Sequence, residues 1–175
     1  MLDPAIEPSV ERANITGMHA VNIHEAKFTY DGTEPDGFLS GEAYGLREAG
    51  GSELNVRLYE ARAGQALCPY HYEYEEEWLL VTEGAPTLRD PDGEHQLKAG
   101  DLVCFGPGAQ GAHQVINRTE QPARVMMWSS AREPVIAVYP DSDKIGVYVP
   151  NEHDSGMVRR RDASVDYWDG ESGPR

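Results

Sequence analysis

The sequence is poor in cysteine and in basic residues, and it has no long apolar run. Its two cysteines, Cys68 and Cys104, are too few for a disulfide framework, and their apolar and aromatic neighbours predict buried free thiols. Lys and Arg together number 15 against 30 Asp and Glu, which gives a formal charge of −15. A protein this acidic repels phosphate backbones and anionic lipid surfaces, so nucleic acid is not an expected partner.

Two further absences concern membranes and export. No window approaches the about 18 consecutive apolar residues that are needed to span a bilayer. Residues 1–17 contain early acids and prolines instead of the charged-then-apolar layout of a secretory signal. We therefore expect a cytoplasmic protein without a membrane partner. Its 175 residues fit one domain of ordinary size.

The pattern of apolar residues indicates an all-β fold. Apolar residues alternate with polar ones or form short blocks, and turn residues interrupt them about every eight to twelve positions, as in a sandwich or barrel. Short turns rich in Gly, Pro and Asp join the blocks, so consecutive strands are expected to pair antiparallel. Strands are predicted at residues 19–30, 53–62, 66–74, 77–83, 86–89, 94–98, 102–105, 112–117, 123–130 and 134–139.

The two ends of the chain have few apolar residues. We predict an N-terminal extension at 1–18, a single barrel domain at 19–149 and a C-terminal tail at 150–175. The tail carries the sequence VDYW at 165–168, and adjacent aromatic residues are unusual in a disordered tail. We expect this segment to dock on the barrel or on a partner subunit, and the protein to be a homodimer.

Acidic residues crowd behind one histidine in the stretch CPYHYEYEEEWLL, residues 68–80. Side chains two apart on an extended strand share a face, so His71 and Glu73 are expected to point the same way. Glu77 has the same parity. His113 lies in a later predicted strand that a barrel can bring beside the first. The four side chains can therefore converge inside the barrel.

Two histidines and one or two carboxylates that converge in this way form a site for a first-row metal ion. Imidazole suits Fe, Zn, Cu and Ni, while carboxylates add hard oxygen donors. Carboxylates crowded in a low-dielectric interior carry a desolvation penalty, which a divalent cation removes. The neighbouring Glu75 and Glu76 are predicted instead to form a solvated acidic turn.

A glycine-rich stretch at 106–111 has the letters of a dinucleotide fingerprint, G-x-G-x-x-G. That fingerprint requires a helix that begins at the third glycine and points its amides at a pyrophosphate. Residues 112–117 alternate like a strand instead. We therefore interpret the stretch as a tight loop between strands.

The two histidine regions also resemble the two short motifs of the cupin superfamily. The first motif is roughly G-x5-H-x-H-x3/4-E-x6-G, and its counterparts in this chain are Gly64, His71, Glu73, Glu77 and Gly84. The second is roughly G-x5-P-x-G-x2-H-x3-N, and its counterparts are Gly100, Pro107, Gly111, His113 and Asn117. Both motifs depart slightly from the family spacing, the first by one extra residue after Gly64.

The resemblance implies an all-β fold, a cupin jelly-roll β-barrel with extended N- and C-terminal segments. It also implies a divalent metal ion bound by His71, Glu77 and His113. Glu73 stands where the family has a second histidine, and its carboxylate can coordinate as well. Two carboxylates in the donor set favour Fe or Mn, and Zn, Ni or Cu stay open.

The fold alone leaves the function open. The first interpretation is a metal-binding cupin that is a small-molecule dioxygenase or isomerase if it is an enzyme. The second is a non-catalytic domain that binds a small metabolite. The third is a metal-free barrel similar to the cupins that act as epimerases. In each case the expected partner is a small-molecule ligand, and no catalytic residue is assigned.

Overall fold

The computed structural model describes residues 12–15, 18–30, 32, 34–38, 40–43, 51–132, 134–149 and 157–163, which form β-strands and short 3-10 turns with no α-helix among them. The strands are β1 (Arg12–Ile15), β2 (Met18–Val21), β3 (Ser40–Ala43), β4 (Leu54–Ala61), β5 (Tyr72–Glu73), β6 (Glu77–Glu83), β7 (Thr87–Asp90), β8 (Gly93–Gln96), β9 (Leu102–Phe105), β10 (Gln114–Ile116), β11 (Ala123–Ser130), β12 (Val135–Tyr139), β13 (Lys144–Tyr148) and β14 (Met157–Arg160). The 3-10 turns are η1 (Ile23–Glu25), η3 (Ala109–Gly111), η4 (Pro140–Ser142) and η5 (Arg161–Ala163).

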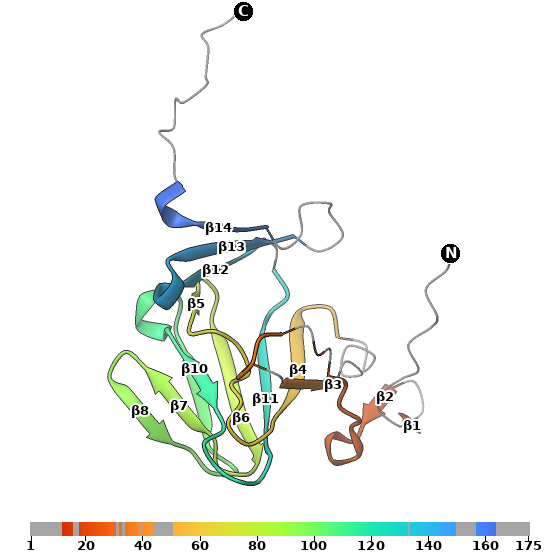
Figure 1. Cartoon of the computed structure of the whole chain (residues 1–175). Coiled ribbons are helices and arrows are strands. Elements are labelled where there is room, and N and C mark those ends of the chain that lie inside the picture. The colour runs from red at the N-terminus through yellow and green to blue at the C-terminus, as the bar shows by residue number, and fades with distance from the viewer. Residues whose placement is uncertain are drawn as a thin grey trace, which may run out of the picture.

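Two layers of strands enclose the core (Figure 1). One layer is the five-stranded sheet β3-β4-β11-β6-β9. The other combines the sheets β14-β13-β12-β5 and β10-β7-β8, which are joined by isolated bridges from His71 to His113 and from Ala66 to Ile116. All the strand pairs are antiparallel, and within the described residues no ladder connects the two layers, so hydrogen bonding does not close a barrel.

Alternation along β6 shows why these sequences form a two-layered structure. Leu79 is 0% exposed and Val81 is 1% exposed, while the intervening side chains are only half-buried. Residues from both layers complete the interior cluster, which comprises Ala61, Leu67, Leu79, Val81, Leu88, Phe105, Val115 and Val125. Apolar burial of this kind stabilises the fold by roughly 25 cal/mol per Å².

The N-terminal region covers part of the outer face of the five-stranded sheet. Leu58 of β4 points outward, and Val21, Ile23, Ala26 and Phe28 pack on it. The predicted strand at 19–30 is wrong beyond residue 21, because η1 interrupts it. The side chain of Asn22 accepts a hydrogen bond from the His24 amide at 3.0 Å, and such local bonds compete with strand pairing.

The other predicted strands are confirmed to within two residues, with one exception. The stretch at 66–74 is largely irregular, and only Tyr72–Glu73 forms a strand there. Strands β1, β3, β13 and β14 were not predicted from the sequence, and β14 lies in the predicted C-terminal tail. The VDYW segment at 165–168 lies outside the described residues, so its docking and the homodimer stay predictions.

The cysteine prediction is partly wrong. Both thiols are free, but only Cys68 is partly buried, whereas Cys104 is exposed. Cys104 lies on β9, an edge strand, and its side chain has the outward parity. Its apolar neighbours in sequence belong to the inner face. Among the described residues, no helix is long and apolar enough to cross a membrane.

Asn117 ties the end of β10 to the end of β4. It is fully buried, and its amide group donates to the carbonyl oxygens of Ala61 at 2.8 Å and Gln121 at 2.7 Å. Its side-chain oxygen accepts hydrogen bonds from the amide of Thr119 at 3.0 Å and from its hydroxyl at 2.7 Å. All the hydrogen-bonding capacity of this buried amide is therefore used.

Replacing Asn117 with alanine should lower the free energy of unfolding by about 3 kcal/mol, because each buried group left unsatisfied costs about 1–3 kcal/mol. Urea denaturation measures the loss. The matched control is Gln121→Ala, an exposed side chain in the same turn, which should change stability by less than about 0.5 kcal/mol. Equal effects of the two substitutions would contradict the role given to Asn117.

Candidate metal centre

Backbone pairing between the two motifs places His71 beside His113. The His71 amide donates to the His113 carbonyl at 3.1 Å, and the His113 amide donates to the His71 carbonyl at 2.8 Å. The two imidazole centroids lie 4.7 Å apart. The bridge extends β5 toward β10. Two segments that are far apart in the sequence therefore lie side by side, and their pairing brings the two histidines together.

The orientation of each imidazole is fixed through Nδ1. His71 Nδ1 lies 3.0 Å from the carbonyl oxygen of Pro69, and His113 Nδ1 lies 2.9 Å from that of Gly111. Since a carbonyl oxygen can only accept, each Nδ1 carries the proton and donates it. The lone pair of each neutral ring is then on Nε2, which is free to bind a metal ion.

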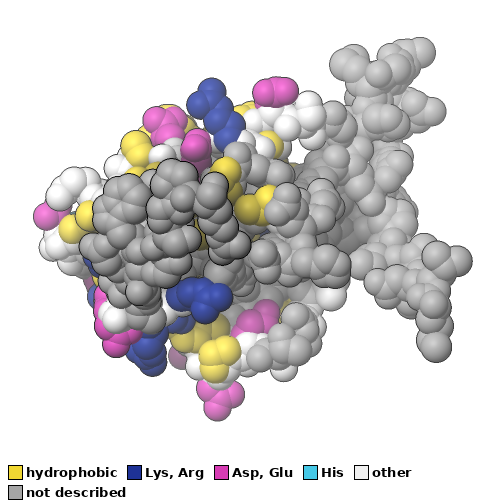
Figure 2. All heavy atoms as spheres, turned by 90° about the horizontal axis from the view of Figure 1, so that it is seen from above, with side chains coloured by type: hydrophobic (Ala, Val, Ile, Leu, Met, Phe, Trp, Pro, Cys, Tyr) yellow, Lys and Arg dark blue, Asp and Glu magenta, His cyan; other side chains and the backbone are white. Residues whose placement is uncertain are grey.

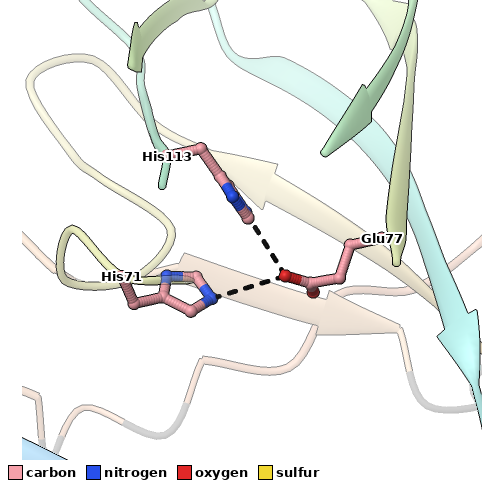
Figure 3. Close-up of side chains that lie close together, drawn as sticks. All are labelled: His71, Glu77 and His113. Atoms are coloured by element: carbon pink, nitrogen blue, oxygen red, sulfur yellow. Dashed lines mark ion pairs between the residues drawn. The ribbon is translucent and has the colours of Figure 1, made fainter. Parts of the chain in front are cut away.

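Both Nε2 atoms point toward one carboxylate oxygen (Figure 3). Glu77 begins β6, and its Oε2 lies 3.9 Å from His71 Nε2 and 3.8 Å from His113 Nε2. One ligand atom from each of the three residues lies within 4.8 Å of the others. In the described part of the chain, His113 Nε2 is a buried polar atom without a hydrogen-bond partner.

Burial controls the protonation of the three residues. It lowers the pKa of His113 to about 3, with a further contribution from the nearby His71, and it lowers the pKa of His71 as well. It raises the pKa of Glu77 to about 8, and the charge of Glu73 adds to this shift. The histidines are therefore neutral at pH 7, and their contacts with Glu77 are not ion pairs.

This donor set fits a divalent metal ion. Neutral imidazole nitrogens are the form that coordinates metals, and the orphaned Nε2 of His113 needs a partner. A cation would also offset the cost of ionising the buried Glu77 carboxyl group. Two histidines and one carboxylate form the facial triad of many non-haem iron sites, which leaves positions open for other ligands.

Glu73 lies close to this group but is not part of the three-residue cluster. It is on β5, opposite Ala137 of β12. Burial raises its pKa to about 7, with the neighbouring Glu75 adding to the shift and Arg57 opposing it. Its interior position agrees with the expected strand parity, and its coordination of a metal stays a prediction.

The two acids predicted to be a solvated turn differ from each other. Glu76 is exposed and accepts a hydrogen bond from Trp78 Nε1 at 2.6 Å. Glu75 is half-buried and accepts one from the hydroxyl of Ser130 at 2.7 Å. The prediction is therefore wrong for Glu75, because the end of β11 lies over this turn and supplies a donor.

Several residues around the site were not anticipated as part of it. Phe105 stacks on His113 with centroids 3.7 Å apart, and Tyr139 stacks on His71 with centroids 6.0 Å apart. The hydroxyl of Tyr139 lies 2.6 Å from that of Tyr148, and Cys68 Sγ lies 3.6 Å from His71 Nδ1. Tyr139 lies in a predicted strand, whereas Tyr148 lies on β13, which was not predicted.

The comparisons with known proteins agree with this architecture. Residues 57–129 match the Cupin domain family. A sugar phosphate isomerase of the cupin superfamily from Silicibacter pomeroyi is 26% identical, with 86% of this chain and 98% of that chain covered and a TM-score of 0.70. No curated protein matches the chain.

Two further solved structures share the fold at lower identity. One, from Acidithiobacillus ferrooxidans, is 18% identical over 74% of this chain and 81% of its own, with a TM-score of 0.65. The polyketide cyclase RemF from Streptomyces resistomycificus is 16% identical over 77% of this chain and 84% of its own, with a TM-score of 0.51. Residues 57–129 thus form a cupin domain, and most of the chain shares its fold with solved proteins of the cupin superfamily.

Proposed function

We propose that this protein is a metal-dependent isomerase of a small hydroxy-carbonyl compound, with sugar phosphates as its substrate class. The observation that carries the proposal is the convergence of His71, Glu77 and His113, with a buried Nε2 that lacks a partner. The similarity to the Silicibacter pomeroyi sugar phosphate isomerase, which spans most of both chains, supports the choice of reaction. The fold proposed for this chemistry is the cupin jelly-roll barrel.

The metal is proposed to be Fe(II) or Mn(II), with Zn, Ni or Cu as the other candidates. Glu77 supplies a hard oxygen, and Glu73, whose charge acts on Glu77 from outside the three-residue cluster, is a second candidate oxygen donor. When bound, such an ion polarises a carbonyl oxygen and stabilises the negative charge that develops on it. His71 and His113 hold the ion through Nε2, and the carbonyl oxygens of Pro69 and Gly111 keep both rings oriented.

Isomerisation between an aldose and a ketose moves a proton from one carbon to its neighbour, so the site needs a base that can take and return it. Within the described part of the chain, Glu73 is the partly buried carboxyl group whose charge acts on Glu77. We assign it the proton transfer, with Glu77 reserved for the metal. The stacked Phe105 and Tyr139 rings shield the two histidines and help to keep water from the reacting carbons.

The donor set itself favours one second candidate. Two histidines and one carboxylate are also the ligands of non-haem iron oxygenases, so a small-molecule dioxygenase uses the same three residues. Oxygen consumption with an iron-loaded protein separates it from an isomerase, which consumes none. Turnover in the absence of oxygen supports the isomerase.

Replacing Glu73 with glutamine should leave one metal per chain but reduce isomerisation at least about 100-fold, because general base catalysis contributes about 10²–10⁴-fold. The measurement is incorporation of deuterium from D2O into a panel of aldose phosphates, followed by NMR. Metal content is measured on the same samples, from protein purified without a histidine tag.

The matched control is Glu75→Gln, the neighbouring acid that bonds Ser130. It should retain both metal and turnover. Loss of the metal in the Glu73 variant would make Glu73 a ligand instead of the base. Absence of both metal and deuterium exchange in the unaltered protein would overturn the proposed function.

A further inference from the structure

Arg57 is a cation that faces the interior of the fold. Its neighbour Leu58 is 1% exposed and packs under the N-terminal region on the outer face of β4. Side chains alternate along a strand, so Arg57 and Tyr59 point to the opposite, inner face. Tyr59 packs against the interior cluster, which confirms this direction for the strand, and the charge of Arg57 opposes the rise in the pKa of Glu73.

The strand register relates Arg57 to the metal centre. Glu77 of β6 is paired with Ser129 of β11, and Met127, two residues earlier on β11, is paired with Arg57 of β4. Arg57 therefore lies on β4, two strands or about 10 Å across the sheet from β6. Along the strand direction it is offset from Glu77 by two residues, which is one position on the inner face. The long side chain of arginine shortens that gap.

Two neighbouring side chains, Glu42 and Tyr59, contact the guanidinium group of Arg57. Its Nη1 donates to Glu42 Oε1 of β3 at 2.6 Å, and the hydroxyl of Tyr59 is a further partner. The side chain of Arg57 is 34% exposed, whereas that of Glu42 is 16% exposed, so Glu42 is the deeper member of the pair. A guanidinium has five N–H donors, and the Glu42 contact uses one nitrogen. The Glu42 contact therefore leaves N–H donors for Tyr59 and for a further acceptor.

Several other arginines of the described chain also form ion pairs, but not on the inner face of the five-stranded sheet. Arg89 is bound by Asp141 through two hydrogen bonds, and Arg118 is bound by Glu94. Arg124 bridges two carboxylates on the outer face of the sheet. The face shown in Figure 2 likewise has acidic and basic side chains interspersed over its described part. The side chains of Arg89 and Arg124 are 34% and 29% exposed, so Arg57 is not more deeply buried than they are, and it differs from them by lying on the inner face of the five-stranded sheet.

We propose that Arg57 binds the oxyanion of the substrate, a phosphate or a carboxylate group, while the reacting end of the molecule lies at His71, Glu77 and His113. The planar fork of arginine matches either oxyanion with two parallel hydrogen bonds. Glu42 and Tyr59 orient the fork before the substrate arrives, which lowers the entropy lost on binding. This inference rests on the proposed function for the identity of the reacting end.

The test is a calorimetric titration of three probes into the full chain, both with and without added Mn(II): ribose 5-phosphate, ribonate and uncharged ribose. Arg57→Met should weaken binding of the charged probe that the site accepts by about 10- to 100-fold, since hydrogen bonds to charged groups contribute about 1.5–3 kcal/mol. Binding of ribose should stay unchanged. The two charged probes separate a phosphate site from a carboxylate site.

Two further variants guard against a purely structural effect. The double variant Glu42→Gln, Arg57→Met leaves no unpaired buried carboxylate and should lose the anion as the single variant does. Glu42→Gln alone should weaken anion binding less than Arg57→Met does, because the glutamine oxygen can still accept from the guanidinium group. The charge-matched control is Arg118→Met, at the surface, which should bind every probe like the unaltered protein.

Metal stoichiometry, measured on each sample, separates failure of this inference from failure of the proposed function. Anion binding that is unchanged in Arg57→Met overturns the inference, whether or not Mn(II) binds. Failure of the unaltered chain to distinguish the charged probes from ribose overturns it as well. Arg57-dependent anion binding without any bound Mn(II) sustains the inference and contradicts the metal centre.

Discussion

Replacing His71 and His113 together with alanine should reduce the bound metal from one equivalent per chain to none. The two imidazoles supply both nitrogen ligands of the candidate site, and Glu77 alone offers only one further carboxylate to the cluster. Elemental analysis of protein purified without a histidine tag gives the stoichiometry. Retention of one equivalent by the double variant would contradict the site.

Thermal unfolding gives an independent measure of the same site. A metal ion that binds only the folded state stabilises it by about 2.7 kcal/mol when its free concentration is 100 times the Kd. For a chain of this length that free energy corresponds to a rise of about 5–10 °C in Tm. The unaltered protein should therefore lose this increment on addition of EDTA, whereas the double variant should show no response to metal or chelator.

The control for two lost histidines is His24→Ala with His95→Ala, since both of these side chains are exposed and lie outside the site. That variant should bind metal normally. Because Phe105 stacks on His113, loss of both site rings can weaken the fold. Glu77→Gln preserves the shape of its side chain and should still lower metal affinity at least about 100-fold, which keeps the test valid if the alanine variant is unstable.

Much of the fold follows from local sequence patterns. Short apolar blocks between turn residues, such as those in EWLLVTE at 77–83 and ARVMMWSS at 123–130, form β6 and β11 with the predicted bounds. The stretch at 66–74 also alternates, yet its backbone pairs with residues 113–117 through bridges and single hydrogen bonds. That long-range pairing, with a proline at 69, decides its conformation, and no local pattern reports it.

The sequence predicted the site less completely than the fold. Parity and motif spacing indicated His71, Glu77 and His113, and the structure brings one ligand atom of each together. Arg57 gave no signal, because an arginine in an alternating strand reads as a surface residue until the covered face of β4 is known. Tertiary packing, which strand periodicity does not contain, assigns the inner face of that strand.

Gly111→Ala should lower both the free energy of unfolding and the affinity for metal, because there is no room for a side chain at this glycine. A Cβ built at Gly111 would lie 1.8 Å from the carbonyl oxygen of Gly106 and 2.9 Å from its carbonyl carbon. The loop must therefore shift, and overpacking of this kind costs about 1–3 kcal/mol or more. The shift also moves the Gly111 carbonyl oxygen that orients His113, and loss of such a partner weakens metal binding by about 10- to 100-fold.

Gly106→Ala is the matched control, since a Cβ at Gly106 would meet nothing within 4 Å although the residue belongs to the same loop. It should leave the free energy of unfolding, measured in urea, within about 0.5 kcal/mol of that of the unaltered protein and leave the metal affinity unchanged. Gly108 differs from both, because its φ of +83° is a backbone conformation that favours glycine. Its amide also donates a hydrogen bond to the Glu73 carbonyl oxygen at 2.6 Å. If Gly111→Ala and Gly106→Ala behave alike in urea denaturation and in metal titration, the close approach of Gly111 to Gly106 does not position His113. If only Gly111→Ala loses affinity, the glycine-rich loop serves the metal centre through that one carbonyl oxygen.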